Sequence, residues 1–399
     1  MATRKGVWGI QDIRDKLLQD DGLWNYDSTV RQLWAWGRNG GYGNLGQNNR
    51  TDYSSPRQVL GDTTEWKYVY SDGDAVGATK NDGTFWVWGR NFNNQALGIQ
   101  ASGYRSSPVQ LPGTNWPTEP GKATFGTTHS AAIKTDGSLW TWGFNSNGRL
   151  GHNQANTSYN SPEQVGSDTT WKSVSVSYEG TYATKTDGTA WSWGWNNNGG
   201  SGGILGHNNQ TIYSSPRQIP GTNWNHVQSA GGYSVLATKS DGTLWTWGSN
   251  AYGGLGINNG TPNVKKSSPT QIGSDNTWSI SIDAMRTSSR ASSGCMKTDG
   301  TLWTLGRNDY GQLGHNSRTD YSSPRQVGSN TTWSQFSTRH DWCAGLKTDG
   351  TLWTWGRNHQ GQLGDGSLTH RSSPTQIGSD TSWSQIQNGT DAGYAIKDI

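Results

Sequence analysis

The sequence predicts an all-β fold, a seven-bladed β-propeller of four-stranded antiparallel blades. Three observations support this prediction. A unit of about 50 to 58 residues recurs seven times, each unit alternates apolar and polar residues as strands do, and the first unit lacks a strand that the C-terminal end supplies. A unit that repeats radially closes into a ring, which protects its sheet edges.

Each unit carries the same four features in the same order: Trp-x-Trp-Gly, a Leu-Gly pair, Ser-Pro, and a further tryptophan that we call the closing tryptophan. Most of the 24 tryptophans occupy these positions, so tryptophan supplies the core of a chain that contains 56 glycines. In the sixth copy Leu305 replaces the second tryptophan. The first motif begins at Trp34, Trp86, Trp140, Trp191, Trp245, Trp303 and Trp353, and the closing tryptophans are Trp66, Trp116, Trp171, Trp224, Trp278, Trp333 and Trp383.

Four strands are expected in each unit. In the fifth unit, residues 236–239 form one strand and residues 243–247 a second, with Trp245 and Trp247 on the same face. Asp241 and Gly242 join them, because Asp-Gly between alternating runs is a strong hairpin signal. Ser-Pro-x-Gln begins a third strand and Thr-Trp-x-x-Val/Ile a fourth.

The two ends of the chain indicate how the ring closes. The Asp-Gly turn is missing before Trp34, where Val30 stands at the Asp position. Residues 393–397 read as the strand that should precede that turn. We therefore expect residues 393–397 to pair with residues 31–37, and we assign residues 30–399 to the propeller.

Residues 1–29 lie outside the repeats. Ile10, Ile13, Leu17 and Leu18 follow helical spacing, so a short N-terminal amphipathic helix is expected. Two interpretations are open. The helix packs on its own propeller, or it anchors the protein to a larger assembly through Trp8 and these four side chains.

Composition excludes several classes of protein. The net charge of +3 and the charged fraction of 15% give no case for a nucleic-acid partner, and no apolar run is long enough for membrane insertion. Two cysteines cannot make a disulfide scaffold or a cysteine-rich zinc site. No repeated Ser/His/Asp set, phosphate-binding loop or complete calcium loop is present. We therefore expect no enzymatic activity, no cofactor and no metal.

Strand connectivity divides the loops between two faces. The Asp-Gly hairpins and the turns before the closing tryptophans share one face, the hairpin face, and their lengths are nearly constant. The loops after each Trp-x-Trp-Gly and those after the closing-tryptophan strands share the opposite face, the loop face, which carries most of the length variation. Because function concentrates on variable loops, partner binding is expected on the loop face.

The loop face is also uneven in chemistry. Directly after Trp-x-Trp-Gly, four units that are consecutive around a closed ring carry arginine, and two of the other three carry an aromatic residue. One interpretation is that each arginine bonds carbonyls of its own loop and stacks on tryptophan. The other is that cations and rings together bind an anionic or sugar-rich partner. The candidate partner-binding residues are Arg38, Arg90, Arg307, Arg357, Phe144, Trp195 and Trp342.

Residues 353–364, Trp-Thr-Trp-Gly-Arg-Asn-His-Gln-Gly-Gln-Leu-Gly, resemble the repeat of the regulator of chromosome condensation family. The resemblance covers about residues 30–399 and implies a seven-bladed propeller. The family's Gly-x-x-His-Ser survives only at residues 126–130, and Trp342 stands at the His position of one other unit. The family includes a guanine-nucleotide exchange factor and protein inhibitors, so the resemblance fixes the fold and leaves the function open.

Residues 6–15 resemble leaders of tailed-phage virion proteins. This resemblance favours a structural or adhesion protein of a phage tail or fibre. Such a protein would be located in the virion, with residues 1–29 contacting other virion proteins and the loop face contacting a host-surface glycan or protein. The alternative is a cytoplasmic regulator, an exchange factor or a protein inhibitor, that docks one globular protein.

Overall fold

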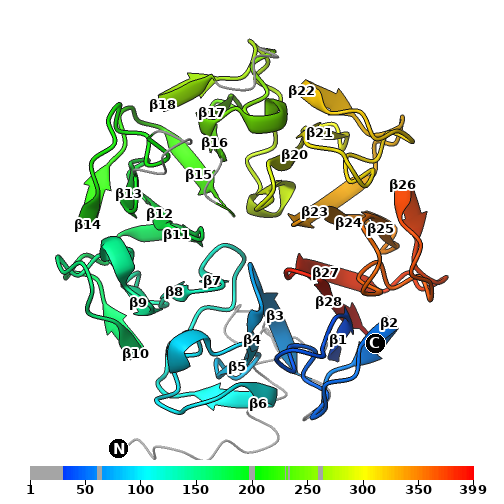
Figure 1. The fold of residues 1–399 in the computed structure, drawn as a ribbon, viewed down its shortest axis with the longest axis horizontal. Helices are drawn as coiled ribbons and strands as arrows, with labels where there is room; N and C mark the ends of the chain where they lie inside the picture. Colours follow the sequence, from blue (N-terminus) through cyan, green and yellow to red (C-terminus); the bar gives the residue numbers. More distant parts are fainter. Residues whose placement is uncertain (1–29, 61–64, 197–202, 230, 232–233, 259–263) are drawn as a thin grey trace, which may run out of the picture.

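The computed structural model describes residues 30–60, 65–196, 203–229, 231, 234–258 and 264–399. These residues form seven four-stranded antiparallel sheets arranged as a ring (Figure 1). The predicted seven-bladed propeller is therefore confirmed. The described part contains no α-helix, and the helix expected within residues 1–29 lies outside the described residues.

The strands of the first four blades in chain order are β3 (Trp66–Tyr70), β4 (Ala75–Lys80), β5 (Phe85–Gly89), β6 (Arg105–Leu111); β7 (Ala123–Phe125), β8 (His129–Ile133), β9 (Leu139–Gly143), β10 (Tyr159–Gln164); β11 (Trp171–Val176), β12 (Gly180–Lys185), β13 (Ala190–Gly194), β14 (Tyr213–Gln218); and β15 (Trp224–Gln228), β16 (Ser234–Lys239), β17 (Leu244–Ser249), β18 (Lys265–Gln271).

The strands of the remaining three blades are β19 (Met285–Thr287), β20 (Ser292–Met296), β21 (Leu302–Gly306), β22 (Tyr321–Gln326); β23 (Trp333–Arg339), β24 (Trp342–Lys347), β25 (Leu352–Gly356), β26 (Arg371–Gln376); and β27 (Trp383–Asn388), β28 (Ala392–Asp398), β1 (Arg31–Gly37), β2 (Tyr53–Gln58). Short 3-10 turns lie at η1 (Phe92–Asn94), η2 (Ser146–Gly148), η3 (Ala251–Gly253) and η4 (Ile282–Ala284).

The blades are offset from the sequence units by one strand. The strand that starts with a closing tryptophan pairs with the first strand of the next unit, as β15 pairs with β16. Figure 1 shows such strands, among them β11, β23 and β27, nearest the centre of the ring. Each blade therefore takes its innermost strand from the preceding unit, and this exchange ties consecutive units together.

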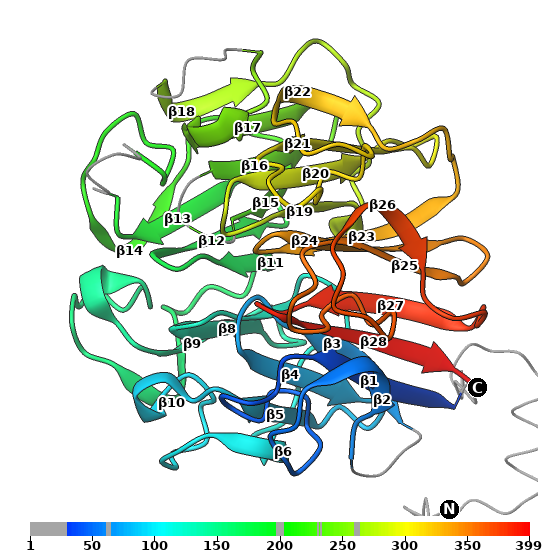
Figure 2. The ribbon, with the colours of Figure 1, turned by 45° about the vertical axis from the view of Figure 1, so that its right-hand side comes forward.

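The ring closes through the two ends of the chain. β1 lies between β2 and β28, and it pairs with β28 from Arg31 opposite Asp398 to Gly37 opposite Ala392. An ion pair of 3.1 Å joins the Arg31 and Asp398 side chains at the end of this ladder. Figure 2 shows β1 and β28 side by side. The predicted pairing of residues 393–397 with residues 31–37 is confirmed.

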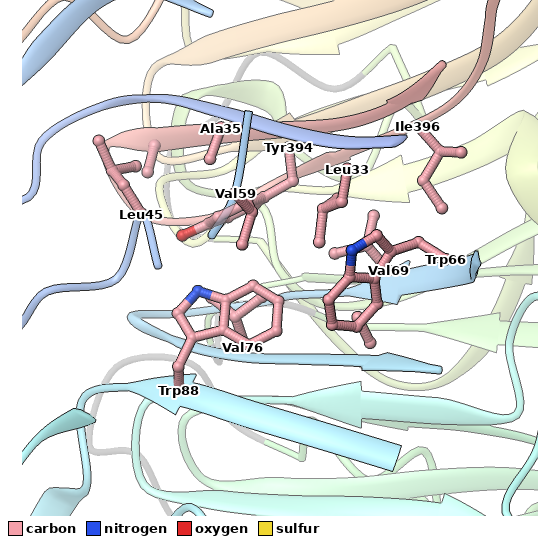
Figure 3. Packing of buried hydrophobic residues seen from close by; sticks show 12 residues of the cluster. Leu33, Ala35, Leu45, Val59, Trp66, Val69, Val76, Trp88, Tyr394 and Ile396 are labelled. Atoms are coloured by element: carbon pink, nitrogen blue, oxygen red, sulfur yellow. The ribbon is translucent and has the colours of Figure 1, made fainter. Parts of the chain in front are cut away.

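The second tryptophan of the repeat connects neighbouring blades. In five copies its fully buried indole N–H donates to a backbone carbonyl of the preceding blade at 2.8–3.0 Å, as Trp247 does to Ile204. The first tryptophan of the motif is half-buried and packs on the edge of the same clusters. Figure 3 shows one inter-blade cluster, where Trp66 and Trp88 face Leu33 and Tyr394 of the closing blade.

Hydrogen bonds confirm the two faces. On the hairpin face, Thr186 donates its N–H to Thr170 in the turn before a closing tryptophan at 2.9 Å. Val30 lies at this face, because Arg31 forms a bridge with Glu65, whose carbonyl accepts from the hairpin residue Asn81. The propeller strand β1 therefore begins on the hairpin face.

Candidate partner-docking face

The loop face is held together by one recurring backbone hydrogen bond. The residue after Trp-x-Trp-Gly donates its N–H to the loop that joins the first two strands of its own blade, and we call these joining segments the inner loops. Arg357 donates to Asp341 at 2.9 Å. Gly356 precedes it with a φ of +103°, and a Cβ there would lie 2.5 Å from the Asp341 carbonyl oxygen, so the motif requires glycine.

This bond places six of the seven candidate residues at equivalent positions around the face. Arg38, Arg90, Arg307, Phe144, Trp195 and Arg357 all make it, at 2.9–3.1 Å. The structure thus brings the four arginines onto four consecutive blades, with Phe144 and Trp195 on two of the remaining three.

Three of the four arginines pair with carboxylates that are less exposed than the arginines themselves. Arg90 lies 3.3 Å from Asp74, Arg38 lies 3.6 Å from Asp391, and Arg357 contacts both Asp341 and Asp391 at 3.8–3.9 Å. The Arg38 side chain is 49% exposed, whereas the Asp391 side chain is 9% exposed. Arg307 pairs with Asp309 of its own loop.

Buried Asp391 is held as an anion by its neighbours. Burial by itself raises the pKa of this carboxyl group, but the contact with His340 and the charges of Arg357 and Arg38 together bring the pKa below its ordinary value. Asp391 therefore stays ionised between Arg38 and Arg357, and this charge holds both guanidinium groups in place.

Aromatic rings of neighbouring loops support the same arginines. The Arg90 guanidinium lies 4.8 Å from the Tyr42 ring centroid, and that of Arg307 lies 5.0 Å from the Tyr252 centroid. One of the two interpretations has each arginine stacking on tryptophan and bonding carbonyls of its own loop. The structure shows the arginines stacked on tyrosine and phenylalanine rings and paired with aspartates instead. The closing tryptophans and the second tryptophans of the motif are buried between the blades, where these arginines do not reach them.

The aromatic candidates divide into two groups. Phe144 and Trp195 are half-buried on the loop face, and the Phe144 ring contacts Phe92 and Arg149. Trp342 has no exposed surface and packs into the cluster that contains Trp36. The Trp342 backbone pairs with Gly356, next to Arg357, but its side chain points into the core between blades and is not available to a partner.

A hollow of about 470 Å³ opens where the inner loops meet at the centre of this face. Arg90, Arg290, Arg307 and Arg339 line it together with exposed Tyr178 and Tyr252. The Arg290 guanidinium group lies 2.9 Å from the carboxylate of the fully buried Asp341. Sequence reasoning missed Arg290, Arg339 and both tyrosines. Arg290 and Tyr178 lie in inner loops whose sequences differ between blades, Arg339 ends β23, and Tyr252 lies in the loop after Trp-x-Trp-Gly. Only ring closure brings these four residues together.

The described residues contain no group of three His, Cys, Asp or Glu side chains that could hold a metal ion. Nor does any helix in those ranges have the length and apolar character needed to cross a membrane.

The chain matches the family model described as RCC1-like domain over residues 33–397. Mouse E3 ubiquitin-protein ligase HERC2 is 29% identical over 259 residues, which is 62% of this chain and 5% of that protein. Ultraviolet-B receptor UVR8 of Arabidopsis thaliana is 29% identical over 256 residues, 63% of this chain and 56% of the receptor. The chain thus spans only part of these relatives.

Two solved structures share the fold. Prp20p of Saccharomyces cerevisiae, whose binding to Gsp1p and histones has been studied, superposes with a TM-score of 0.78 at 16% identity, covering 93% of this chain and 92% of Prp20p. Human WBSCR16 superposes with a TM-score of 0.76 at 18% identity, and the superposition covers 92% of this chain and 99% of WBSCR16.

The family match begins at residue 33, so it lends no support to a phage-like leader in residues 1–29, and the relatives named above are cellular proteins. The repeat, the ring of seven blades and the match over residues 33–397 agree. This chain belongs to the RCC1-like domain family, whose propeller is a protein-binding domain.

Proposed function

We propose that this chain is a non-enzymatic cellular regulator that docks one globular protein on its loop face. The observation that carries the proposal is the layered charge of that face, where exposed guanidinium groups lie over buried carboxylates. These arginine side chains are already held in one orientation. They would therefore lose little conformational entropy when a partner binds to them.

Charge and aromatic area coincide at the centre of the same face. Tyr178 is 48% exposed and Tyr252 is 50% exposed at the hollow that Arg90 and Arg307 line. Arginine and tyrosine are enriched among residues that dominate the binding energy of protein interfaces. This combination favours a protein surface as the ligand.

The relatives support a cellular regulator over a virion protein. A ubiquitin ligase and a light receptor are regulatory proteins by name, and Prp20p is a protein studied for its protein partners. We therefore prefer a cellular regulator to a virion protein. Within the cellular reading, an exchange factor and a protein inhibitor both dock a single globular partner.

A matched pair of double variants tests the proposal. R90Q/R307Q removes two guanidinium groups that stack on tyrosines of the loop face. R57Q/R217Q removes two that stack on Tyr53 and Tyr213 of the outer strands. A partner captured by the wild-type chain from cells of its source is then titrated against both variants.

We expect R90Q/R307Q to weaken partner binding by at least about tenfold, equivalent to about 1.4 kcal/mol. R57Q/R217Q should bind as the wild type does, and circular dichroism melting curves should show that both variants fold. Equal affinities of the two variants for the partner would contradict docking on the loop face.

A further inference from the structure

Two grooves of nearly equal size lie between neighbouring blades, at equivalent positions in the repeat. The first, about 480 Å³, lies between β22 and the β23–β26 blade. The second, about 430 Å³, lies between β10 and the β11–β14 blade. Each is walled by a histidine, two tryptophans, a lysine and the Ser-Pro of the outer strand.

The lysine occupies the same place in both grooves. The Lys347 ammonium lies 3.7 Å from the Trp353 ring centroid and 5.3 Å from that of Trp333. In the second groove, the Lys185 ammonium lies 4.2 Å and 4.7 Å from the corresponding tryptophans. The two grooves therefore present one cation against the same pair of aromatic rings.

The two grooves differ in the acid that neutralises the lysine. Asp168 pairs with Lys185 at 2.5 Å, and this ion pair is the leading cause that brings the pKa of Asp168 to about 2. Asn330 stands at the Asp168 position beside Lys347, and no carboxylate of the described residues lies within ion-pair distance of Lys347.

The loop that carries Asn330 keeps the shape of its counterpart. The Asn330 side-chain oxygen accepts the Thr332 N–H at 2.9 Å, as the Asp168 carboxylate accepts the Thr170 N–H at 2.8 Å. Two further blades with the same Gly-Ser-Asp loop also pair the acid with lysine, through Asp275–Lys297 and Asp380–Lys397. The Asn330 loop therefore differs from its counterparts in charge and keeps the same turn.

A second difference in charge also makes the first groove more positive than the second. Exposed Arg325 lines the first groove and stacks on Tyr321, with its guanidinium carbon 4.7 Å from the ring centroid. The equivalent residue of β10 is Glu163, which does not line the second groove, so that groove has no cation at this position. His315 adds no charge near neutral pH, because burial lowers its pKa to about 4.

We infer that the groove between β22 and the β23–β26 blade binds a carboxylate carried on an apolar or aromatic body. The ligand's carboxylate would take the place that Asp168 takes against Lys185, and its body would lie along Trp353 and Pro374. A volume of about 480 Å³ falls within the usual range of small-ligand sites. The inference is independent of partner docking on the loop face.

Nuclear magnetic resonance titration with phenylacetate tests this assignment, with neutral phenylacetamide as the matched control ligand. We expect phenylacetate to shift the Trp353 indole N–H signal saturably and phenylacetamide to bind at least about tenfold more weakly. N330D introduces the acid that three sister loops carry, so it should fold and should weaken phenylacetate binding at least fivefold.

The converse variant, D168N/E163R, transfers the charge pattern of the first groove to the second. We expect it to gain a saturable phenylacetate shift at Trp191. Equal binding of the two ligands, or unchanged phenylacetate affinity in N330D, would overturn the inference. A failure of D168N/E163R to bind would show that charge does not distinguish the grooves, which equally contradicts it.

Discussion

The imidazole of His226 is completely buried between Ser173 and Gln228, its ring nitrogens 3.2 and 3.1 Å from their side-chain oxygens. Burial, with the nearby charge of Arg286, lowers the pKa of His226 to about 3. Because the unfolded chain has a histidine pKa of about 6.5, the stabilising contribution of neutral His226 is complete above pH 6.5 and is lost as the pH falls toward 3.

Replacing His226 by glutamine should therefore flatten the pH dependence of unfolding. One proton bound only by the unfolded state contributes a slope of about 1.4 kcal/mol per pH unit. We expect urea unfolding between pH 4 and 5.5, where the unfolded histidine is almost fully protonated and folded His226 is not, to give a shallower slope for H226Q by about this amount. Other buried histidines, such as His129, leave the remaining slope in the variant. An identical slope in both proteins would show that His226 does not titrate in this way.

Single positions also show where sequence patterns stop being informative. The burial of Trp247 followed from a motif repeated in nearly every blade, and the structure confirms it. Trp342, at the His position of its unit, is among the partner-binding residues expected from the sequence, yet it begins β24 and its side chain faces the neighbouring blade. His129 occupies the equivalent place in β8 and is buried too, so position in the blade outweighs residue type there.

At the scale of one strand, β28 determines whether the ring is closed. It pairs with β27 on one side and with β1 on the other. A missing turn at one end of the sequence and an extra strand at the other were sufficient to predict this. The offset of the innermost strand was not predictable from the pattern, since the spacing along the chain does not say which neighbouring sheet a strand joins.

Deleting residues 393–399 should lower the melting temperature by more than about 5 °C, because the deletion removes both ladders and exposes the edges of β1 and β27. Differential scanning calorimetry gives the shift, and light scattering should report aggregation from the exposed edges. Removal of Ile399 alone is the control, since its side chain is 64% exposed. A melting curve unchanged by the longer deletion would refute closure through β28.

Considered as a whole, the molecule has two unlike faces. Hydrogen-bonded hairpins of nearly constant length form one face, and arginines over buried carboxylates form the other. The division into faces followed from connectivity alone. The central hollow did not, because Arg290, Tyr178 and Tyr252 come from three different blades and meet only in the closed ring.

Hydrogen–deuterium exchange of the chain with its captured partner tests docking on the loop face most directly. We predict that the partner slows exchange in the inner loops around Asp74, Tyr178 and Arg290 and leaves the hairpins at Asp136 and Asp241 unchanged. Protection confined to the hairpins, with the inner loops exchanging as in the free protein, would contradict the proposed function.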